Sequence, residues 1–205
     1  MKKPISTFVL LICALATLNS CSTSSISKSQ RKAEMSNSKE NGSYDCFVKM
    51  NDGSIVQYKT LKLVTGAFKS PFLLADGKKK IKASQIVAYQ NKDHYAVSQK
   101  IFYGGKISHV ATETLPGFAI RTVKGRLNIY CKKYYNGQVS ADEFYLQVGE
   151  SGWIQPYSAE LMNEVLKDNP EAFVFFNNKK FKGHFNDKLL ATAQLYNNGQ
   201  FASIK

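Results

Sequence analysis

The sequence predicts an α+β domain, in which an antiparallel β unit comes first and helices pack on it afterwards. Between residues 44 and 157, turn signals recur about every 8–12 residues, which is typical of an antiparallel sheet, a sandwich or a partly closed barrel. From residue 158 onwards, the apolar residues recur at helical spacing instead. Strands followed by a block of helices indicate the α+β class. We therefore expect one domain over residues 44–205, β-rich over 44–157 and helical over 158–205.

The predicted strands are joined by short turns in which glycine recurs. Asp52-Gly53 separates the strand-like segments 46–50 and 54–58, and this pair readily adopts the positive φ angles of a tight hairpin turn. Segment 84–99 is expected to be a strand, a short turn and a second strand. Four further turns are expected, at Asp76-Gly77, Lys124-Gly125, Asn136-Gly137 and Glu150-Ser151-Gly152.

One irregularity is expected early in the β unit. Val56 and Tyr58 share one phase of the alternation, whereas Leu61 and Leu63 have the other phase. A slip of one residue moves side chains to the opposite face of a sheet. We therefore expect a bulge or a break near Thr60.

Three helices are predicted in the last part of the chain, from capping residues and apolar stripes. They are a helix over 159–169 capped by Ser158, a helix from Pro170 to Phe176 opened by Asn169-Pro170, and a helix over 187–197 capped by Asn186 and closed by Gly199.

The start of the chain has the features of an export signal. Lys2 and Lys3 precede an apolar run, Ile5 to Leu18, that has the length of a secretory signal segment and is too short to cross a bilayer comfortably. The residues Leu18-Asn19-Ser20-Cys21 resemble the lipobox of bacterial lipoproteins, with an aliphatic residue three places before the cysteine and a small residue just before it. The resemblance implies that residues 1–20 are a signal peptide, and that Cys21 receives a diacylglycerol thioether and a further acyl chain on its new amino group. The alternatives are an ordinary secretory signal that leaves a soluble protein, and an uncleaved helix.

The resemblance also implies a location. Ser22, in place of aspartate, is similar to the outer-membrane choice in the sorting pattern of enteric-type bacteria, so we expect a lipid anchor in the outer membrane that faces the periplasm. A Gram-positive envelope is the alternative. Residues 21–43 are serine-rich and nearly free of large apolar groups, and such a segment cannot offset the entropy lost on ordering. We expect a flexible tether with a typical reach of about 25 Å.

The chain is strongly basic, with a formal net charge of +13 over 205 residues. Removal of Lys2 and Lys3 with the signal leaves 13 − 2 = +11. Export takes the protein away from nucleic acid, so we expect no nucleic-acid partner. The anionic partners outside the cytoplasm are lipid headgroups, lipopolysaccharide phosphates and acidic glycans, and a well-spread lysine surface that aids solubility is the competing interpretation.

The lysines form clusters that could bind such partners. If the fold brought the clusters to one face, they would form a patch for an anionic lipid or glycan; otherwise, they protect strand edges and turns against aggregation. The clustered residues are Lys78, Lys79, Lys80, Lys82, Lys132, Lys133, Lys179, Lys180 and Lys182.

Two of the four cysteines would remain for the folded part, because Cys13 leaves with the signal and Cys21 takes lipid. Cys46 and Cys131 both lie in strand-like segments, and an oxidising compartment would allow a disulfide between them. Two buried thiols are the other interpretation. Separation along the chain does not decide between them, because a disulfide depends on the distance between the Cα atoms.

No catalytic motif stands out. Ser151 in Gly149-Glu150-Ser151-Gly152-Trp153 superficially resembles the serine of trypsin-like proteases, but its strand-turn-strand setting favours a hairpin loop. His94, His109 and His184 lack zinc-site spacing and are expected in exposed turns or strands.

A possible acid–base or cation pair, Asp142-Glu143, fits a solvated loop better. Alternation would point Phe144 and Leu146 inward, and Tyr145 and Gln147 outward. We expect no cofactor and no metal.

The sequence as a whole favours a non-enzymatic lipoprotein of the cell envelope that binds a lipid, a glycan or an envelope protein. Two alternatives are an envelope hydrolase acting on glycan or lipid, and a structural or stress-related lipoprotein without a ligand site.

Overall fold

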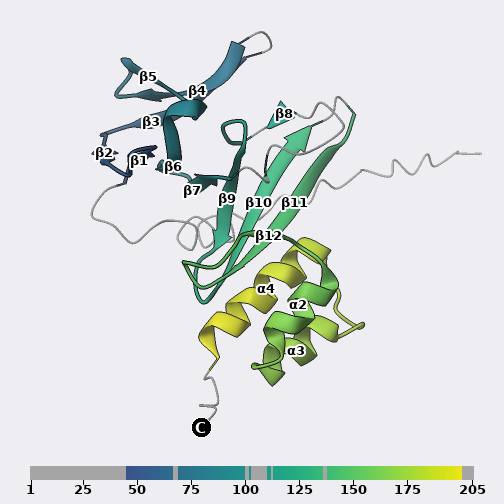
Figure 1. Ribbon diagram of the computed structural model, residues 1–205. Coiled ribbons are helices and arrows are strands. Elements are labelled where there is room, and N and C mark those ends of the chain that lie inside the picture. Colours follow the sequence, from purple (N-terminus) through teal and green to yellow (C-terminus); the bar gives the residue numbers. More distant parts are fainter. Residues whose placement is uncertain are drawn as a thin grey trace, which may run out of the picture.

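The computed structural model describes residues 45–66, 69–99, 102, 110–111, 113–135 and 138–199. The expected signal peptide, the lipobox and the tether lie outside these residues, as do His109 and the turn at Asn136-Gly137. The α+β class is confirmed, because an antiparallel sheet carries helices from the C-terminal part of the chain (Figure 1).

Nine of the described strands form one large antiparallel sheet with the order β12-β11-β10-β9-β7-β6-β1-β2, and β8 pairs with β10 beside this path. The strands are β1 (Phe47–Met50), β2 (Ile55–Gln57), β6 (Ile86–Gln90), β7 (Tyr95–Ser98), β8 (Val110–Ala111), β9 (Phe118–Val123), β10 (Leu127–Tyr135), β11 (Ser140–Val148) and β12 (Gln155–Pro156). The β1–β2, β6–β7, β9–β10, β10–β11 and β11–β12 neighbours are hairpins, as the turn pattern predicts.

A second, smaller sheet interrupts the large one in sequence. It consists of β3 (Leu61–Gly66), β4 (Lys69–Ala75) and β5 (Lys79–Lys82), and the 3-10 helix η1 (Ala83–Gln85) leads from it back to β6. The phase change at Thr60 is therefore a change of sheet, which is the break, one of the two expected irregularities. Thr60 is fixed there, because its N–H donates to Asp76 Oδ1 at 2.8 Å and its carbonyl accepts from the Asp76 N–H at 2.9 Å.

Of the two Asp-Gly turns, one has positive φ angles at both residues and the other at its glycine alone. Gly53 between β1 and β2 has φ +85°. Asp76 and Gly77 between β4 and β5 have φ +50° and +70°, the two positive angles of a type I′ hairpin turn.

The helices are α2 (Ala159–Leu166), α3 (Pro170–Asn177) and α4 (Phe185–Asn198). Ser158 caps α2 through a hydrogen bond that its hydroxyl accepts from Leu161 N–H, as predicted. At the start of α3, Asn169 Oδ1 accepts from Ala172 N–H at 3.0 Å.

The prediction for the start of α4 is wrong by two residues. The helix begins at Phe185, with His184 at the N-cap position, so Asn186 lies inside the first turn. The amide of Asn186 donates to Asp142 Oδ2 of β11 at 2.9 Å instead of capping the helix. A contact with the sheet therefore replaces the local capping bond.

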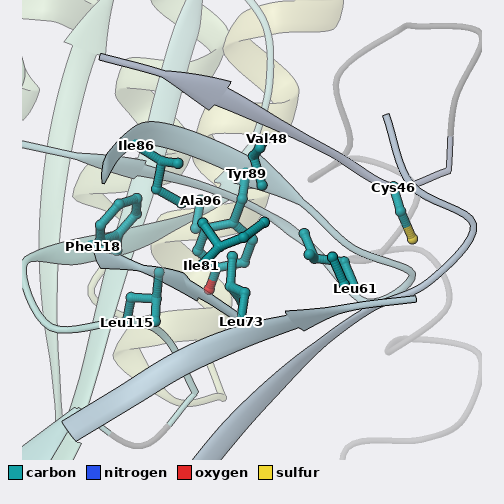
Figure 2. Packing of buried hydrophobic residues seen from close by; sticks show 11 residues of the cluster. Cys46, Val48, Leu61, Leu73, Ile81, Ile86, Tyr89, Ala96, Leu115 and Phe118 are labelled. Carbon is teal, nitrogen blue, oxygen red and sulfur yellow. The ribbon is translucent and has the colours of Figure 1, made fainter. Parts of the chain in front are cut away.

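One face of the large sheet carries two separate hydrophobic clusters. Under the small sheet, Val48, Tyr89, Ala96 and Phe118 pack with residues of β3 to β5 (Figure 2). Towards the other end, apolar residues of β9, β10 and β11 pack with the three helices. Paired residues of an antiparallel sheet share a face, and the register joins Val48, Tyr89, Ala96, Ile120, Cys131 and Phe144 across the sheet.

The two cysteines are buried thiols in this fold, not a disulfide. Cys46 precedes β1 and Cys131 lies on β10, and the strands β6, β7 and β9 stand between these two strands. Four strand spacings amount to about 19 Å, whereas bridged cysteines have Cα atoms within about 7 Å. The candidate disulfide is therefore ruled out by the order of the strands.

Candidate ligand-binding site

The face of the large sheet opposite the two clusters holds a polar cavity of about 370 Å³. Six strands contribute to the cavity: β1, β6, β7, β9, β10 and β11. Side chains alternate along each strand, so the residues next to those in the hydrophobic clusters point to this opposite face. The side chains that give it its chemistry are Lys49, Tyr95, Arg121, Asn128, Tyr130 and Gln147. We call this cavity the Arg121 pocket.

Arg121 is the buried cation of this pocket. It lies on β9 and is only 4 % exposed. Its guanidinium carbon is 4.4 Å from the centre of the Tyr95 ring, which comes from the neighbouring strand β7. The Tyr95 ring in turn packs against Phe47 of β1, with ring centres 6.2 Å apart. Aromatic packing of this kind holds a guanidinium plane in place and stabilises its charge.

A hydrogen-bond network fixes the wall next to Arg121. Tyr130, directly opposite Arg121 on β10, donates its hydroxyl proton to Gln147 Oε1 at 2.7 Å. The Gln147 amide nitrogen donates to the carbonyls of Glu150 and Gly152, at 3.1 and 2.9 Å. Gln147 thus connects the floor of the pocket to the β11–β12 turn at its rim.

The electrostatic character of the pocket is cationic. Two of its lining residues carry positive charge, the buried Arg121 and the exposed Lys49. The lining carboxylate in the described residues is Glu150, whose side chain is 70 % exposed and lies 3.9 Å from Lys124. Solvent screens an exposed carboxylate, whereas a buried guanidinium keeps most of its field.

Beside the pocket, the same face is covered by aromatic side chains. Phe102 packs edge-to-face on Tyr145 with ring centres 4.7 Å apart, and the two rings cluster with Ala119 and Tyr130. Burial raises the pKa of Tyr145 above its ordinary value, so its phenol stays neutral. The predicted alternation holds, because Tyr145 and Gln147 point to this face and Phe144 and Leu146 pack under the helices; both outward residues are nevertheless largely buried.

The lysine clusters do not lie on one face, so the condition for a single anionic-ligand patch is not met. Lys78, Lys79, Lys80 and Lys82 belong to the β4–β5 turn and to β5, whereas Lys179, Lys180 and Lys182 join α3 to α4 at the other end of the molecule (Figure 1). Because β5 is an edge strand of the small sheet, its lysines fit the alternative role of protecting that edge.

The middle cluster is engaged in ion pairs. Lys132 is 12 % exposed, pairs with Glu143 at 3.6 Å and donates to the carbonyl of Phe102 at 2.8 Å. Lys133 pairs with Glu113 at 3.3 Å. These contacts neutralise the two charges locally.

The described residues considered for catalysis do not line the Arg121 pocket, although Ser151 belongs to the turn at its rim. Ser151 is in the β11–β12 turn, as the hairpin interpretation predicts. Glu143 accepts a hydrogen bond from the Tyr145 hydroxyl at 3.1 Å, besides its ion pair with Lys132. His94 is not exposed as expected; it is half-buried, and its ring contacts Tyr89.

The described residues contain no cluster of His, Cys, Asp or Glu side chains that could hold a metal ion. In the same part of the chain, no helix is both long enough and apolar enough to span a membrane. Comparisons with protein-family models, with curated proteins and with solved structures find no match to this chain.

Sequence reasoning missed the residues of this pocket. The available signal was a set of polar residues inside otherwise apolar strands, such as Arg121 in Phe118–Val123 and Gln147 in the apolar end of β11. Their convergence depends on β7, β9 and β10 being neighbours, which local patterns do not specify.

Proposed function

We propose that this chain is a lipid-anchored protein of the cell envelope, and that its folded domain binds a small anionic ligand in the Arg121 pocket without chemical conversion. The observation that carries the proposal is the buried guanidinium in a polar cavity. The anchor rests on the resemblance of Leu18–Cys21 to a lipobox.

The chemistry of arginine supports an anionic ligand. A guanidinium offers donors in a planar fork that matches carboxylate and phosphate oxygens. Arg121 lines the cavity, and the Tyr95 ring packs against its guanidinium group. The volume of about 370 Å³ lies within the usual range for small-molecule sites, about 300–1,000 Å³.

The surrounding groups support a ligand with further polar functions. Asn128, Tyr130 and Gln147 are amide and phenol side chains. The donors of Tyr130 and Gln147 are used in the network described above, and their oxygen atoms remain as acceptors for hydroxyl groups of a ligand. A small carboxylate or phosphate compound with hydroxyl groups, such as a sugar acid or a sugar phosphate, matches this lining. Such compounds are available outside the cytoplasm as parts of acidic glycans and lipopolysaccharide.

The ligand proposal is tested by calorimetric titration with inorganic phosphate, acetate and glucuronate. We expect saturable binding of at least one of them, and at least a tenfold loss of affinity in Arg121→Gln. The matched control is Arg126→Gln, because Arg126 pairs with Asp168 at the surface and does not line the pocket.

A residue-level signal makes the test sharper. The arginines of the chain are Arg31, Arg121 and Arg126, so the side-chain Nε–Hε resonance of Arg121 can be assigned by substitution and followed during the titration. A shift of this resonance on binding supports the site. Equal affinities of wild type and Arg121→Gln would refute it.

The anchor is tested separately by intact-mass analysis of the mature protein from a bacterial envelope. We expect cleavage before Cys21 and the added mass of a diacylglycerol and a further acyl chain, and we expect Cys21→Ala to remain unprocessed. An unmodified mature protein from the wild-type gene would refute the anchor and leave the ligand proposal standing.

A further inference from the structure

A second, larger cavity lies between the small sheet and the large one. Its volume is about 610 Å³, and it is lined by Thr60 to Leu63 at the start of β3, by the β6–β7 turn from Asn91 to His94, and by Glu113. We call it the His94 pocket. It borders the hydrophobic cluster of Figure 2, to which Leu61 and Tyr89 belong.

His94 is held in a defined position by its own turn. Asn91 Oδ1 accepts hydrogen bonds from the N–H groups of Asp93 and His94, at 2.9 and 2.8 Å. The imidazole Nε2 lies 3.1 Å from the hydroxyl oxygen of Tyr89, and the two rings meet edge-to-face. Tyr89 is fully buried, so this contact anchors the ring to the core.

The imidazole is neutral at ordinary pH. Burial lowers the pKa of His94 to about 4, against the smaller opposing effect of the Asp93 and Glu113 carboxylates. Burial also raises the pKa of Tyr89, so its phenol keeps its proton. In the contact with Tyr89, Nε2 accepts from or donates to the phenol according to the tautomer, and in both tautomers the neutral imidazole contributes a polar group without a charge.

The rest of the lining combines two leucines with equal numbers of positive and negative side chains. Leu61 is 5 % exposed and Leu63 is half-buried, and both come from β3. The charged lining residues are two cations, Lys62 and Lys92, and two carboxylates, Asp93 and Glu113. The Glu113 carboxylate is further paired with Lys133.

We propose that the His94 pocket binds a small uncharged molecule with a mainly apolar body. Its volume lies within the range of ligand sites, about 300–1,000 Å³. The leucines cover the apolar body, and the neutral imidazole contributes a hydrogen bond that orients it. A charged ligand would meet no excess of opposite charge here, in contrast to the Arg121 pocket. The proposal does not depend on the Arg121 pocket being a ligand site.

The test uses two fluorescent probes with the same skeleton. N-phenyl-1-naphthylamine is uncharged, and 8-anilinonaphthalene-1-sulfonate adds one sulfonate to it. We expect saturable one-to-one binding of the uncharged probe to the full chain. In the Arg121→Gln variant, the cationic pocket no longer contributes to binding. We expect this variant to bind the sulfonate at least tenfold more weakly than the uncharged probe.

The variant that tests the site is Leu63→Lys, which places a charge in the cavity from an edge strand. Its matched control is Ile55→Lys, the same change of chemistry at an exposed position of β2. We expect Leu63→Lys to lose at least tenfold in affinity for the uncharged probe and Ile55→Lys to bind like wild type. Thermal unfolding and circular dichroism of both variants show whether each one is folded.

Three outcomes would overturn the proposal. The first is that the uncharged probe does not bind saturably. The second is that Leu63→Lys and Ile55→Lys bind the uncharged probe with equal affinity. The third is that Arg121→Gln binds both probes with equal affinity. Should Leu63→Lys unfold, Thr60→Lys serves as the second variant, because Thr60 also lines the cavity and a charge there should likewise weaken binding of the uncharged probe by at least tenfold.

Discussion

The two pockets share one hairpin and differ in chemistry because they lie on opposite sides of it. His94 is the last residue before β7 and Tyr95 is its first residue, and they contribute to different pockets. Successive side chains of a strand point to opposite faces. The Arg121 pocket therefore receives a tyrosine that packs on a buried cation, and the His94 pocket receives a neutral imidazole beside leucines.

The comparison shows that a few lining residues decide the electrostatic character of each cavity. The larger cavity balances its charges, whereas the smaller one buries a guanidinium with its nearest lining carboxylate exposed to solvent. Substitutions on one side of the hairpin should therefore leave the other side intact.

The largest effect is expected for Tyr89→Ala. Tyr89 is fully buried in the cluster under the small sheet and also holds His94. Loss of a large buried aromatic side chain should lower the free energy of unfolding by about 3–5 kcal/mol. Chemical denaturation measures this change, and a loss below about 1 kcal/mol would contradict the assigned packing.

The second-largest effect is the pH dependence that His94 gives to the free energy of unfolding. The native pKa of about 4 lies below the ordinary value of 6.5, so between these values the unfolded chain binds a proton that the native protein does not. Stability should therefore fall as the pH is lowered from about 6.5 to about 4, by at most about 3 kcal/mol.

Denaturation at a series of pH values in wild type and His94→Gln isolates this contribution, since the carboxylates titrate equally in both proteins. We expect the difference between the two stabilities to change over this window and to be constant above about pH 7. A constant difference at all pH values would mean that His94 is not held neutral by burial.

Tyr95→Leu should have a smaller effect, and it should be confined to the other pocket. It removes the ring that packs on Arg121 and keeps an apolar side chain in place. The cation–π contact corresponds to about 0.5–2 kcal/mol, so phosphate affinity should fall several-fold. Binding of N-phenyl-1-naphthylamine should stay within twofold of wild type, and a parallel loss of both ligands would show that the two sides are coupled.

The smallest effect is expected for Lys133→Gln. The pair with Glu113 is partly exposed at 3.3 Å, and such pairs contribute less than about 1 kcal/mol. We expect a decrease of this size in unfolding free energy and a change of less than twofold in probe affinity. A large loss of affinity would show that Glu113 must be held in place for the His94 pocket to form.

Local chemistry explains how far the sequence predicts the fold. Asp52-Gly53 and Asp76-Gly77 form tight turns, and Ser158 caps its helix, because each signal acts through bonds within a few residues. The predicted start of α4 is wrong because the Asn186 side chain donates a hydrogen bond to Asp142 of β11 instead of capping its own helix. The phase shift at Thr60 predicts an irregularity there but leaves a bulge and a break open, since both produce the same shift, and the fold has the break.

The site could not be predicted in the same way. Arg121, Tyr95 and Gln147 come together only through the pairing of β7, β9, β10 and β11. The lysine clusters do not form one patch for the same reason. Runs such as Lys78–Lys80 and Lys179–Lys180 are conspicuous in the sequence, but different elements carry them. The buried guanidinium, a single charge in an apolar strand, was the more informative residue.

The division of one sheet face between two hydrophobic clusters has a consequence for the dynamics of the protein. β9 contributes Phe118 to the cluster under the small sheet and Val123 to the cluster under the helices. Amide hydrogen exchange should therefore reveal two cooperative units that open independently, with the helices exchanging in one step and the small sheet in another. β9, held by both, should be the last segment to lose its protection.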